Sequence, residues 1–224
     1  MGPKTRILDA TMLVFRRHGF RRSSIEQVAE AAGLTRQALY HHFESREALF
    51  RAVIERVHEG AIAAEQAAIS EAEQAGGSLA DILVAGMTAR MSTMIASFDG
   101  SPHIEELYSE HLAQARDLYQ KYSVIYADRL VETVTRVARR QKLVLPQGMS
   151  PAEFARLVEM AVHGSKSQHP AMQPAEAFLK DMALMVRTLC AGAVAKPQGP
   201  QAAKAATRVA AKDKTSRRKA GGHP

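Results

Sequence analysis

Tryptophan is absent from the chain, cysteine occurs once, and aromatic residues make up only 5% of the sequence. With Cys190 alone, the chain cannot form an internal disulfide or a zinc site built from several thiolates. We expect Cys190 to be a small buried side chain on the last helix. The N-terminus is not followed by a long apolar run, so we expect neither a signal peptide nor a membrane span. These absences favour a soluble, cytoplasmic protein.

The abundant residues are alanine, leucine, valine and methionine, and we expect an all-α fold from them. The net charge of +7 is distributed unevenly along the 224 residues. From Lys196 to the end there are eight basic residues and one acidic residue, whereas residues 1–50 carry +3 and residues 51–195 carry −3. The two positive regions are where nucleic acid would bind.

Residues 24–50 have the pattern of two short helices separated by a tight turn. Apolar residues recur at helical spacing between Ile25 and Ala32 and give one narrow apolar face. Gly33 stands where a helix ends in a left-handed residue, and Thr35 can cap the helix that follows. Either Ser23 or Ser24 would cap the first of the two helices, and a third helix begins after Ser45.

The second short helix, from Arg36 to about His42, has Leu39 and Phe43 as its inward residues. Its outward face is polar and consists of Thr35, Arg36, Gln37, Tyr40 and His41. This is a helix-turn-helix arrangement, whose second helix is the kind that enters a DNA major groove.

Residues 19–50 resemble the N-terminal domain of TetR-type (TetR/AcrR) transcriptional regulators. The resemblance rests on Gly19-Phe20, on the VAEAAGLT turn, and on LYHHF followed by SREAL. It covers about a quarter of the chain. Gln37 stands where the family pattern often has a small residue, and Arg46 stands where it often has lysine.

We predict that Arg36 contacts guanine and Gln37 contacts adenine, with Thr35 or His41 in support. Phosphate contacts are predicted for Tyr40, Arg46 and Ser23 or Ser24. For the serine, the resemblance implies this role, and a helix N-terminus suits it electrostatically.

The expected organisation is a helix-turn-helix DNA-binding domain at 1–48, a helical ligand-binding and dimerisation domain at 49–194, and a disordered basic tail at 195–224. A long helix over 46–75 would connect the first two domains. Further helices are predicted over 79–98, 103–115, 118–142, 151–166 and 175–191.

The middle helices carry methionine and tyrosine side chains suited to an adaptable pocket for an unknown small molecule, although methionines at this spacing also form ordinary cores. The candidates are Met87, Met91, Met94, Phe98, Tyr108, His111, Tyr119, Tyr122 and Tyr126. The resemblance implies that a ligand here changes the spacing of two DNA-reading helices.

The last two helices are apolar on more than one face, so either they are fully buried or one face pairs with a second copy of the chain. The resemblance implies a two-fold dimer, and two copies on a palindrome multiply base discrimination. The predicted interface consists of Phe154, Leu157, Val158, Ala161, Phe178, Met182, Met185 and Leu189.

Glu55 and His58 have the Glu-x-x-His spacing of di-iron helical bundles, but the sequence has no second copy of this motif. We expect both side chains to lie on the surface, and we predict no catalysis, cofactor or metal. The predicted function is that of a ligand-responsive repressor, released from a palindromic operator by a small molecule. The alternatives are a nucleoid-type protein that coats DNA through its tail, and a metal-binding helical enzyme.

Overall fold

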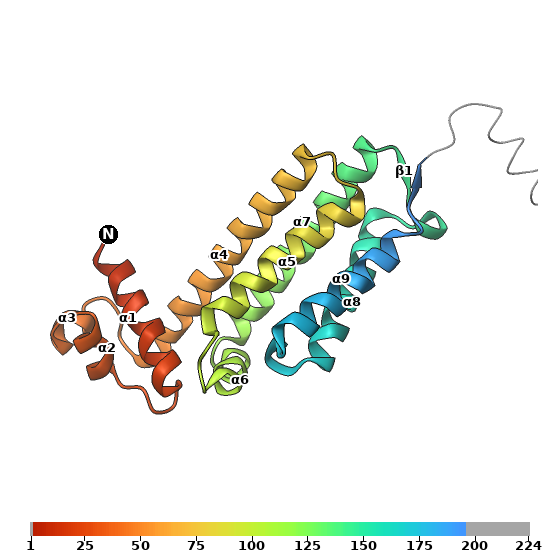
Figure 1. Cartoon of the computed structure of the whole chain (residues 1–224). Coiled ribbons are helices and arrows are strands. Elements are labelled where there is room, and N and C mark those ends of the chain that lie inside the picture. Colours follow the sequence, from red (N-terminus) through yellow and green to blue (C-terminus); the bar gives the residue numbers. More distant parts are fainter. Residues whose placement is uncertain (1, 196–224) are drawn as a thin grey trace, which may run out of the picture.

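The computed structural model describes residues 2–195 and shows an all-α fold, as predicted (Figure 1). A small head at one end contains α1 (Pro3–His18), α2 (Ile25–Ala31) and α3 (Arg36–Tyr40). The long helix α4 (Arg46–Gln74) leads from this head along the whole larger domain. The predicted tail from Lys196 onward lies outside the described residues.

The larger domain continues with α5 (Leu79–Phe98), α6 (Ile104–Gln114), α7 (Arg116–Arg140), α8 (Pro151–Gln168) and α9 (Ala175–Cys190). Short 3-10 turns follow α7 and α8, at Pro146–Gly148 and Pro170–Met172. Two residue pairs, β1 (Leu143–Val144) and β2 (Val194–Ala195), form a small antiparallel contact that was not predicted.

Most helices begin at a side-chain cap, which explains why their starts could be predicted. Thr35 accepts a hydrogen bond from the backbone N–H of Ala38, and Ser45 accepts one from Ala48. Ser150 forms a reciprocal capping box with Glu153, and Pro151 occupies the first helical position. The turn residue Gly33 has φ +66°, the left-handed conformation expected of it.

Two apolar cores lie side by side. The smaller core joins α1, α2 and α3 to the first turns of α4, with Leu39 and Leu49 fully buried in it. The larger core fills the helical bundle but begins inside the head, at Phe15 and Phe20. Their rings meet Phe50 of α4 at centroid distances of 5.6 and 4.8 Å. The head is therefore packed onto the bundle through these three aromatic rings.

Helix α5 lies in the middle of the bundle, in contact with α4, α7 and α9. It is long and apolar enough to cross a membrane, with a mean hydropathy of 1.3, but half of that window is buried inside the protein. Its apolar character is that of a core helix. Gly86 lets α5 approach α4 closely, because a Cβ atom at this position would lie 2.6 Å from Cγ1 of Ile69.

Candidate nucleic-acid interface and ligand pocket

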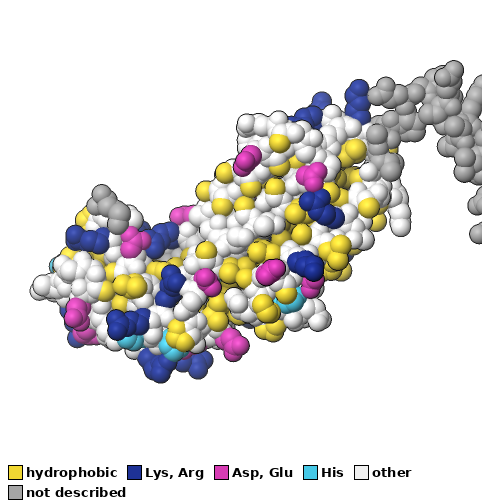
Figure 2. Space-filling view, viewed as in Figure 1, with side chains coloured by type: hydrophobic (Ala, Val, Ile, Leu, Met, Phe, Trp, Pro, Cys, Tyr) yellow, Lys and Arg dark blue, Asp and Glu magenta, His cyan; other side chains and the backbone are white. Residues whose placement is uncertain are grey.

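Helix α3 is held in the head by one buried side chain, and the rest of its surface is open. Leu39 is fully buried between α3 and its neighbours. All five residues predicted for the outward face are exposed: Thr35, Arg36, Gln37, Tyr40 and His41. Several Lys and Arg side chains lie on the surface of this end of the molecule (Figure 2). The structure thus brings hydrogen-bonding side chains together on a short, positively charged helix.

The Arg36 side chain is held by two neighbours in the absence of DNA. Its Nη1 atom lies 2.6 Å from the carboxylate of Glu26 on α2. Its Nη2 atom donates to the Tyr40 hydroxyl at 3.3 Å, one turn later on α3. Both pairs are exposed, so solvent and salt screen them. Arg36 would exchange the Glu26 carboxylate for a base edge on entering a major groove.

Of the two candidate serines, Ser24 caps α2, and Ser23 is buried. The Ser24 hydroxyl accepts from the Gln27 backbone N–H at 3.2 Å, and the Gln27 side chain accepts from the Ser24 N–H at 2.8 Å. The Ser23 hydroxyl points inward and donates to carbonyl oxygens of Gly19 and Val14. With Ser23 only 4% exposed, its hydroxyl is not available to a phosphate, which corrects the prediction to Ser24.

Arg46, which is predicted to contact phosphate, also makes several contacts within the protein. Its guanidinium lies over the Phe20 ring, 4.4 Å from the centroid. Its Nη1 atom donates to the backbone carbonyls of Arg21 and Ser23 at 3.1 and 3.2 Å, and Nη2 pairs with Glu47. These three hydrogen bonds tie Arg46 to its neighbours in the loop between α1 and α2 and on α4, and its phosphate contact stays a prediction.

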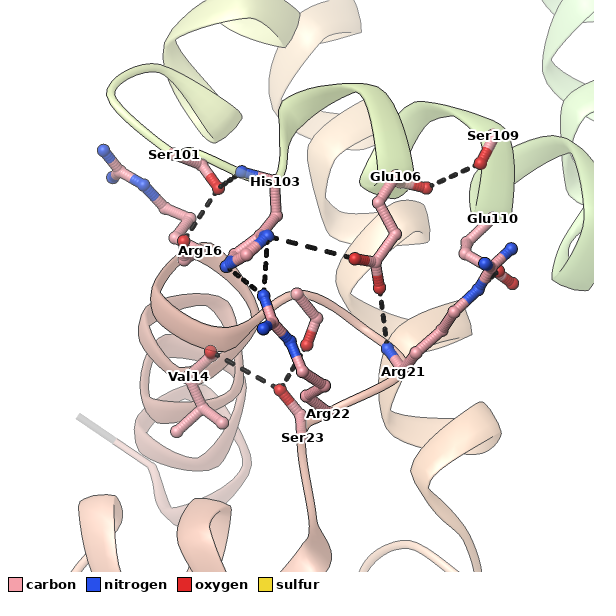
Figure 3. A network of polar contacts seen from close by, with 11 residues as sticks. Val14, Arg16, Arg21, Arg22, Ser23, Ser101, His103, Glu106, Ser109 and Glu110 are labelled. Atoms are coloured by element: carbon pink, nitrogen blue, oxygen red, sulfur yellow. Dashed lines mark hydrogen bonds and ion pairs between the residues drawn. The ribbon is translucent and has the colours of Figure 1, made fainter.

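That same loop touches the larger domain through a network of polar contacts (Figure 3). The Arg21 backbone N–H donates to Glu106, and its Nε donates to Glu110, both at 2.8 Å. Ser101, in the loop before α6, donates to the Arg16 carbonyl at 2.7 Å. We call this set the α1–α6 junction. It was not predicted from the sequence, because its members are about 85 residues apart.

A second polar link joins α4 to the start of α7. Arg51 makes a bidentate ion pair with Asp117, at 2.7 and 2.6 Å, and also donates to the Gln114 carbonyl. The hydrogen bonds from Arg51 lower the pKa of Asp117 to about 2. Asp117 is therefore ionised throughout the physiological range.

The bundle contains a cavity of about 640 Å³ lined by residues of α4, α5, α6, α7 and α8 and by the turn after α8. The predicted residues that line it are Met91, Met94, Phe98, Tyr108, His111, Tyr119 and Tyr126. Met87 and Tyr122 do not. Met87 is buried in the core between α4, α5 and α7. The Tyr122 ring stacks on the His58 ring with 4.2 Å between their centroids, and its hydroxyl donates to the Glu55 carbonyl of α4.

The expectation that His58 lies on the surface is wrong. Its ring is 3% exposed and lines the cavity, with Nδ1 2.9 Å from the Tyr126 hydroxyl and Nε2 3.4 Å from Nε2 of His111. Burial lowers the pKa of His58 to about 3 and that of His111 to about 4. Glu55 faces the other way and pairs with Lys121 at 2.9 Å. The Glu-x-x-His motif therefore does not converge on one site.

Two cations of the cavity wall were not predicted. Arg90 is only 2% exposed and comes from the otherwise apolar helix α5. Lys166 comes from α8, and burial lowers its pKa to about 8. The signal for Arg90 was present in the sequence, since a lone arginine inside an apolar helix is expensive to bury without a function or a partner.

The structure also revises which residues of α8 and α9 can meet a second copy. Four of the predicted interface residues fill the core of the protomer: Phe154, Val158, Phe178 and Met182. Others lie at the edge of the surface, partly buried: Leu157, Ala161, Met185 and Leu189. The exposed apolar residues are Met160 on α8, 56% exposed, and Leu184 on α9, 62% exposed.

The sequence of the head matches a family model described as "Bacterial regulatory proteins, tetR family" over residues 7–53. The regulator UidR of Escherichia coli K12 is 38% identical over 60 residues, which are 27% of this chain and 31% of UidR. The repressor KstR2 of Rhodococcus jostii is 38% identical over 48 residues, 21% of this chain and 24% of KstR2. The chain thus spans about a third of these relatives or less.

Solved structures match the fold over most of the chain. A transcriptional regulator from Cytophaga hutchinsonii has a TM-score of 0.66 at 14% identity, over 86% of this chain and 99% of that one. SmeT, the repressor of the Stenotrophomonas maltophilia multidrug efflux pump SmeDEF, has a TM-score of 0.59 at 25% identity, over 87% and 91%. These relatives carry the names of regulators rather than of enzymes. The head thus matches the sequence of the tetR family of bacterial regulatory proteins, and most of the chain shares the fold of solved transcriptional regulators.

Proposed function

We propose that the protein is a dimeric, ligand-responsive DNA-binding regulator of transcription that acts in the cytoplasm as a repressor. The observation that carries this proposal is the exposed polar face of α3, from Thr35 to His41, on a helix anchored by the single buried residue Leu39. A helix of this length needs no such face for folding, and its side chains suit base edges in a major groove.

Within this function, each exposed residue of α3 has a distinct role. Arg36 donates to guanine, Gln37 makes paired hydrogen bonds with adenine, and Thr35 or His41 supports them. Tyr40 and the N-terminus of α2 at Ser24 contact phosphates and set the register. Arg46 supports binding indirectly, since it holds the loop that presents Ser24.

A ligand in the cavity can act on the head because α4 and α6 each line the cavity and also contact the head. His58 of α4 and His111 of α6 line the cavity, and α6 also carries Glu106 and Glu110 of the α1–α6 junction. A ligand releases DNA only if it binds more tightly to the conformation that cannot bind the operator.

Dimerisation through the exposed faces of α8 and α9 would give the protein two copies of α3, which suits a palindromic operator. The proposed contact centres on Met160 and Leu184, with Leu157, Ala161, Met185 and Leu189 around them. The description of SmeT as the repressor of an efflux pump supports repression as the mode of action.

The test is selection of genomic DNA fragments by the purified protein, followed by footprinting, with and without cell extract. We expect a small set of fragments that share an inverted repeat, protection on both half-sites, and release by a component of the extract. The variant Arg36→Ala should lose protection at one base pair of each half-site. Retention of all fragments alike would favour a nucleoid-type coating protein instead. A footprint that extract never releases would disprove ligand control.

A further inference from the structure

Arg90 has hydrogen-bond donors that nothing in the described part of the protein satisfies. Its Nε and Nη1 atoms are buried and have no hydrogen-bond partner among residues 2–195. The Nη1 atom lies 3.3 Å from the Glu65 carboxylate, close enough for an ion pair but without hydrogen-bond geometry. The guanidinium also lies 4.3 Å from the centroid of the Tyr126 ring. Buried donors of a charged group are costly to leave unpaired, and Arg90 is one of the residues that line the cavity.

Glu65 does not neutralise the positive charge at this end of the cavity. Its second oxygen lies 3.5 Å from Nε of Arg129, so one carboxylate serves two guanidinium groups. Burial raises the pKa of Glu65, because its charged form is poorly solvated there. One positive charge is left over among these three side chains, and Arg90 is the member of the three that lines the cavity.

Lys166 adds a second cation to the same wall. Its pKa is lowered to about 8 first by burial and then by the charge of Arg90, whereas Glu159 acts in the opposite direction. Lys166 is still mainly protonated at neutral pH, and both Arg90 and Lys166 line the cavity. The neighbouring rings of His58 and His111 are neutral, since their pKa values are about 3 and 4.

Two carboxylates also line the cavity, and one of them, Glu159, is near enough to Lys166 to raise its pKa. The other, Glu105, is exposed. Glu159 lies 3.9 Å from Nε2 of the exposed residue His163. The remaining wall is mostly apolar, with flexible methionine side chains at Met91 and Met94. Such a wall suits the hydrocarbon or aromatic body of a ligand.

We propose that the effector of this protein is an amphipathic anion, whose carboxylate or other oxyanion binds Arg90 and Lys166 while its apolar body fills the methionine-lined part of the cavity. This inference rests on the proposed function, because it names the chemical class of the ligand that the cavity takes. An arginine and a lysine in the wall of a mostly apolar pocket are groups that recognise an oxyanion in a low-dielectric site.

A matched pair of fluorescent probes tests the charge preference directly. 1-Anilinonaphthalene-8-sulfonate carries a sulfonate, and N-phenyl-1-naphthylamine is the same aromatic body without it. Because the chain has no tryptophan, protein emission does not mask either probe. Titration of the full chain should show the anionic probe bound at least about tenfold more tightly, which corresponds to about 1.4 kcal/mol. Equal binding of the two probes, or preference for the neutral one, would overturn the proposal.

Two variants locate the charge effect in the cavity. The first variant is Lys166→Met. The second combines Arg90→Met with Glu65→Gln, which removes both partners of a buried ion pair. Each should reduce binding of the anionic probe about tenfold. Binding of the neutral probe should stay within about twofold. Lys121→Met is the control, because Lys121 is an exposed cation outside the cavity that pairs with Glu55. Circular dichroism melts verify that each variant is folded.

Competition with further ligands tests the charge preference of the cavity independently of the proposed control of DNA binding. Decanoate should displace the bound probe, and decanol and decyltrimethylammonium should displace it far less well. If the ammonium compound displaces the probe best, Glu159 and Glu105 dominate, and the anion proposal is wrong. A neutral or cationic molecule that releases operator DNA through this cavity would also refute it, while leaving ligand control intact. Conversely, selective binding of anions without any effect on DNA would refute ligand control but not the anion site.

Discussion

The Nε atom of Arg21 lies 2.8 Å from the carboxylate of Glu110, across the boundary between the head and the bundle. Glu110 is buried and also accepts a hydrogen bond from Gln114 at 3.1 Å, whereas Arg21 is largely exposed. The next residue on α6, His111, lines the cavity. Two successive residues of α6 thus contact the loop between α1 and α2 and line the cavity, so we expect a shift of α6 to alter both places.

Gly19 allows the loop to approach α6, and its replacement should therefore weaken the α1–α6 junction. Its φ and ψ of +77° and 170° lie in a region almost restricted to glycine, and a Cβ atom would lie 2.6 Å from the Glu106 carboxylate. We expect Gly19→Ala to cost about 1–3 kcal/mol in the free energy of unfolding. The comparison is Gly33→Ala, which has strained φ but open space and should cost about 1 kcal/mol. Urea denaturation measures both, and equal losses would show that the approach to Glu106 is unimportant.

Removal of the negative partner of Arg36 should strengthen DNA binding. Glu26→Gln frees the guanidinium and removes a carboxylate from the face that meets phosphates. Arg36→Ala should instead weaken operator binding by about ten- to a hundredfold, with the loss confined to one base pair per half-site. Fluorescence anisotropy with operator variants measures these effects. The proposed role of Arg36 fails if Arg36→Ala weakens specific and unrelated DNA equally.

The buried histidines should make stability depend on pH in the weakly acidic range. Folding lowers the pKa of His58 to about 3, so below the unfolded value of about 6.5 only the unfolded chain takes up this proton. The stabilising contribution is complete above pH 6.5 and decreases as the pH falls toward 3. Between pH 7.5 and 5.5 the wild type should lose roughly 1 kcal/mol through His58 alone.

Two variants test whether the pH dependence of the unfolding free energy arises from the buried His58 ring. His58→Gln should show a smaller loss of unfolding free energy between pH 7.5 and 5.5, even if it is less stable at both. His163→Gln serves as the control, because the His163 side chain is 53% exposed. Urea denaturation at the two pH values gives the slopes, and a wild-type slope in His58→Gln would contradict the assignment.

A charge at the exposed apolar face of α9 should prevent dimerisation. Leu184→Glu places a carboxylate where the proposed interface excludes water, and this should give a monomer by light scattering after gel filtration. Val124→Glu on α7 is a matched control, since Val124 is 61% exposed and Leu184 is 62% exposed. The control should keep the wild-type mass. If Leu184→Glu remains a dimer with full operator affinity, the interface lies elsewhere.

The helices could be predicted from the sequence because their ends are marked by local chemistry. Ser45, Ser150 and Gly33 act within a few residues of their own position, so their roles follow from spacing alone. The outward face of α3 was predictable for the same reason. Within a five-residue helix, one buried leucine decides which side chains face solvent.

Roles that depend on distant partners could not be predicted in this way. The sequence predicts a phosphate contact for Arg46 but does not reveal its position over the Phe20 ring or its hydrogen bonds to two carbonyls of the preceding loop. Phe178 and Met182 on α9 were assigned to a partner copy, although both are fully buried in the protomer. A helix that is apolar on several faces does not reveal which face meets its own bundle, since that choice depends on packing across the whole domain.

The contact between Gly86 and Ile69 has a mechanical consequence for the long helix α4. Because the Ile69 side chain of α4 packs directly against the backbone of α5 at Gly86, we expect the outer half of α4 to move together with the bundle centre. A change in the position of the head relative to the bundle would then arise in the turns of α4 nearest Phe50, or else carry α5 along. We expect substitution of Gly86 by a larger residue to push α4 and α5 apart and to change the angle at which the head leaves the bundle.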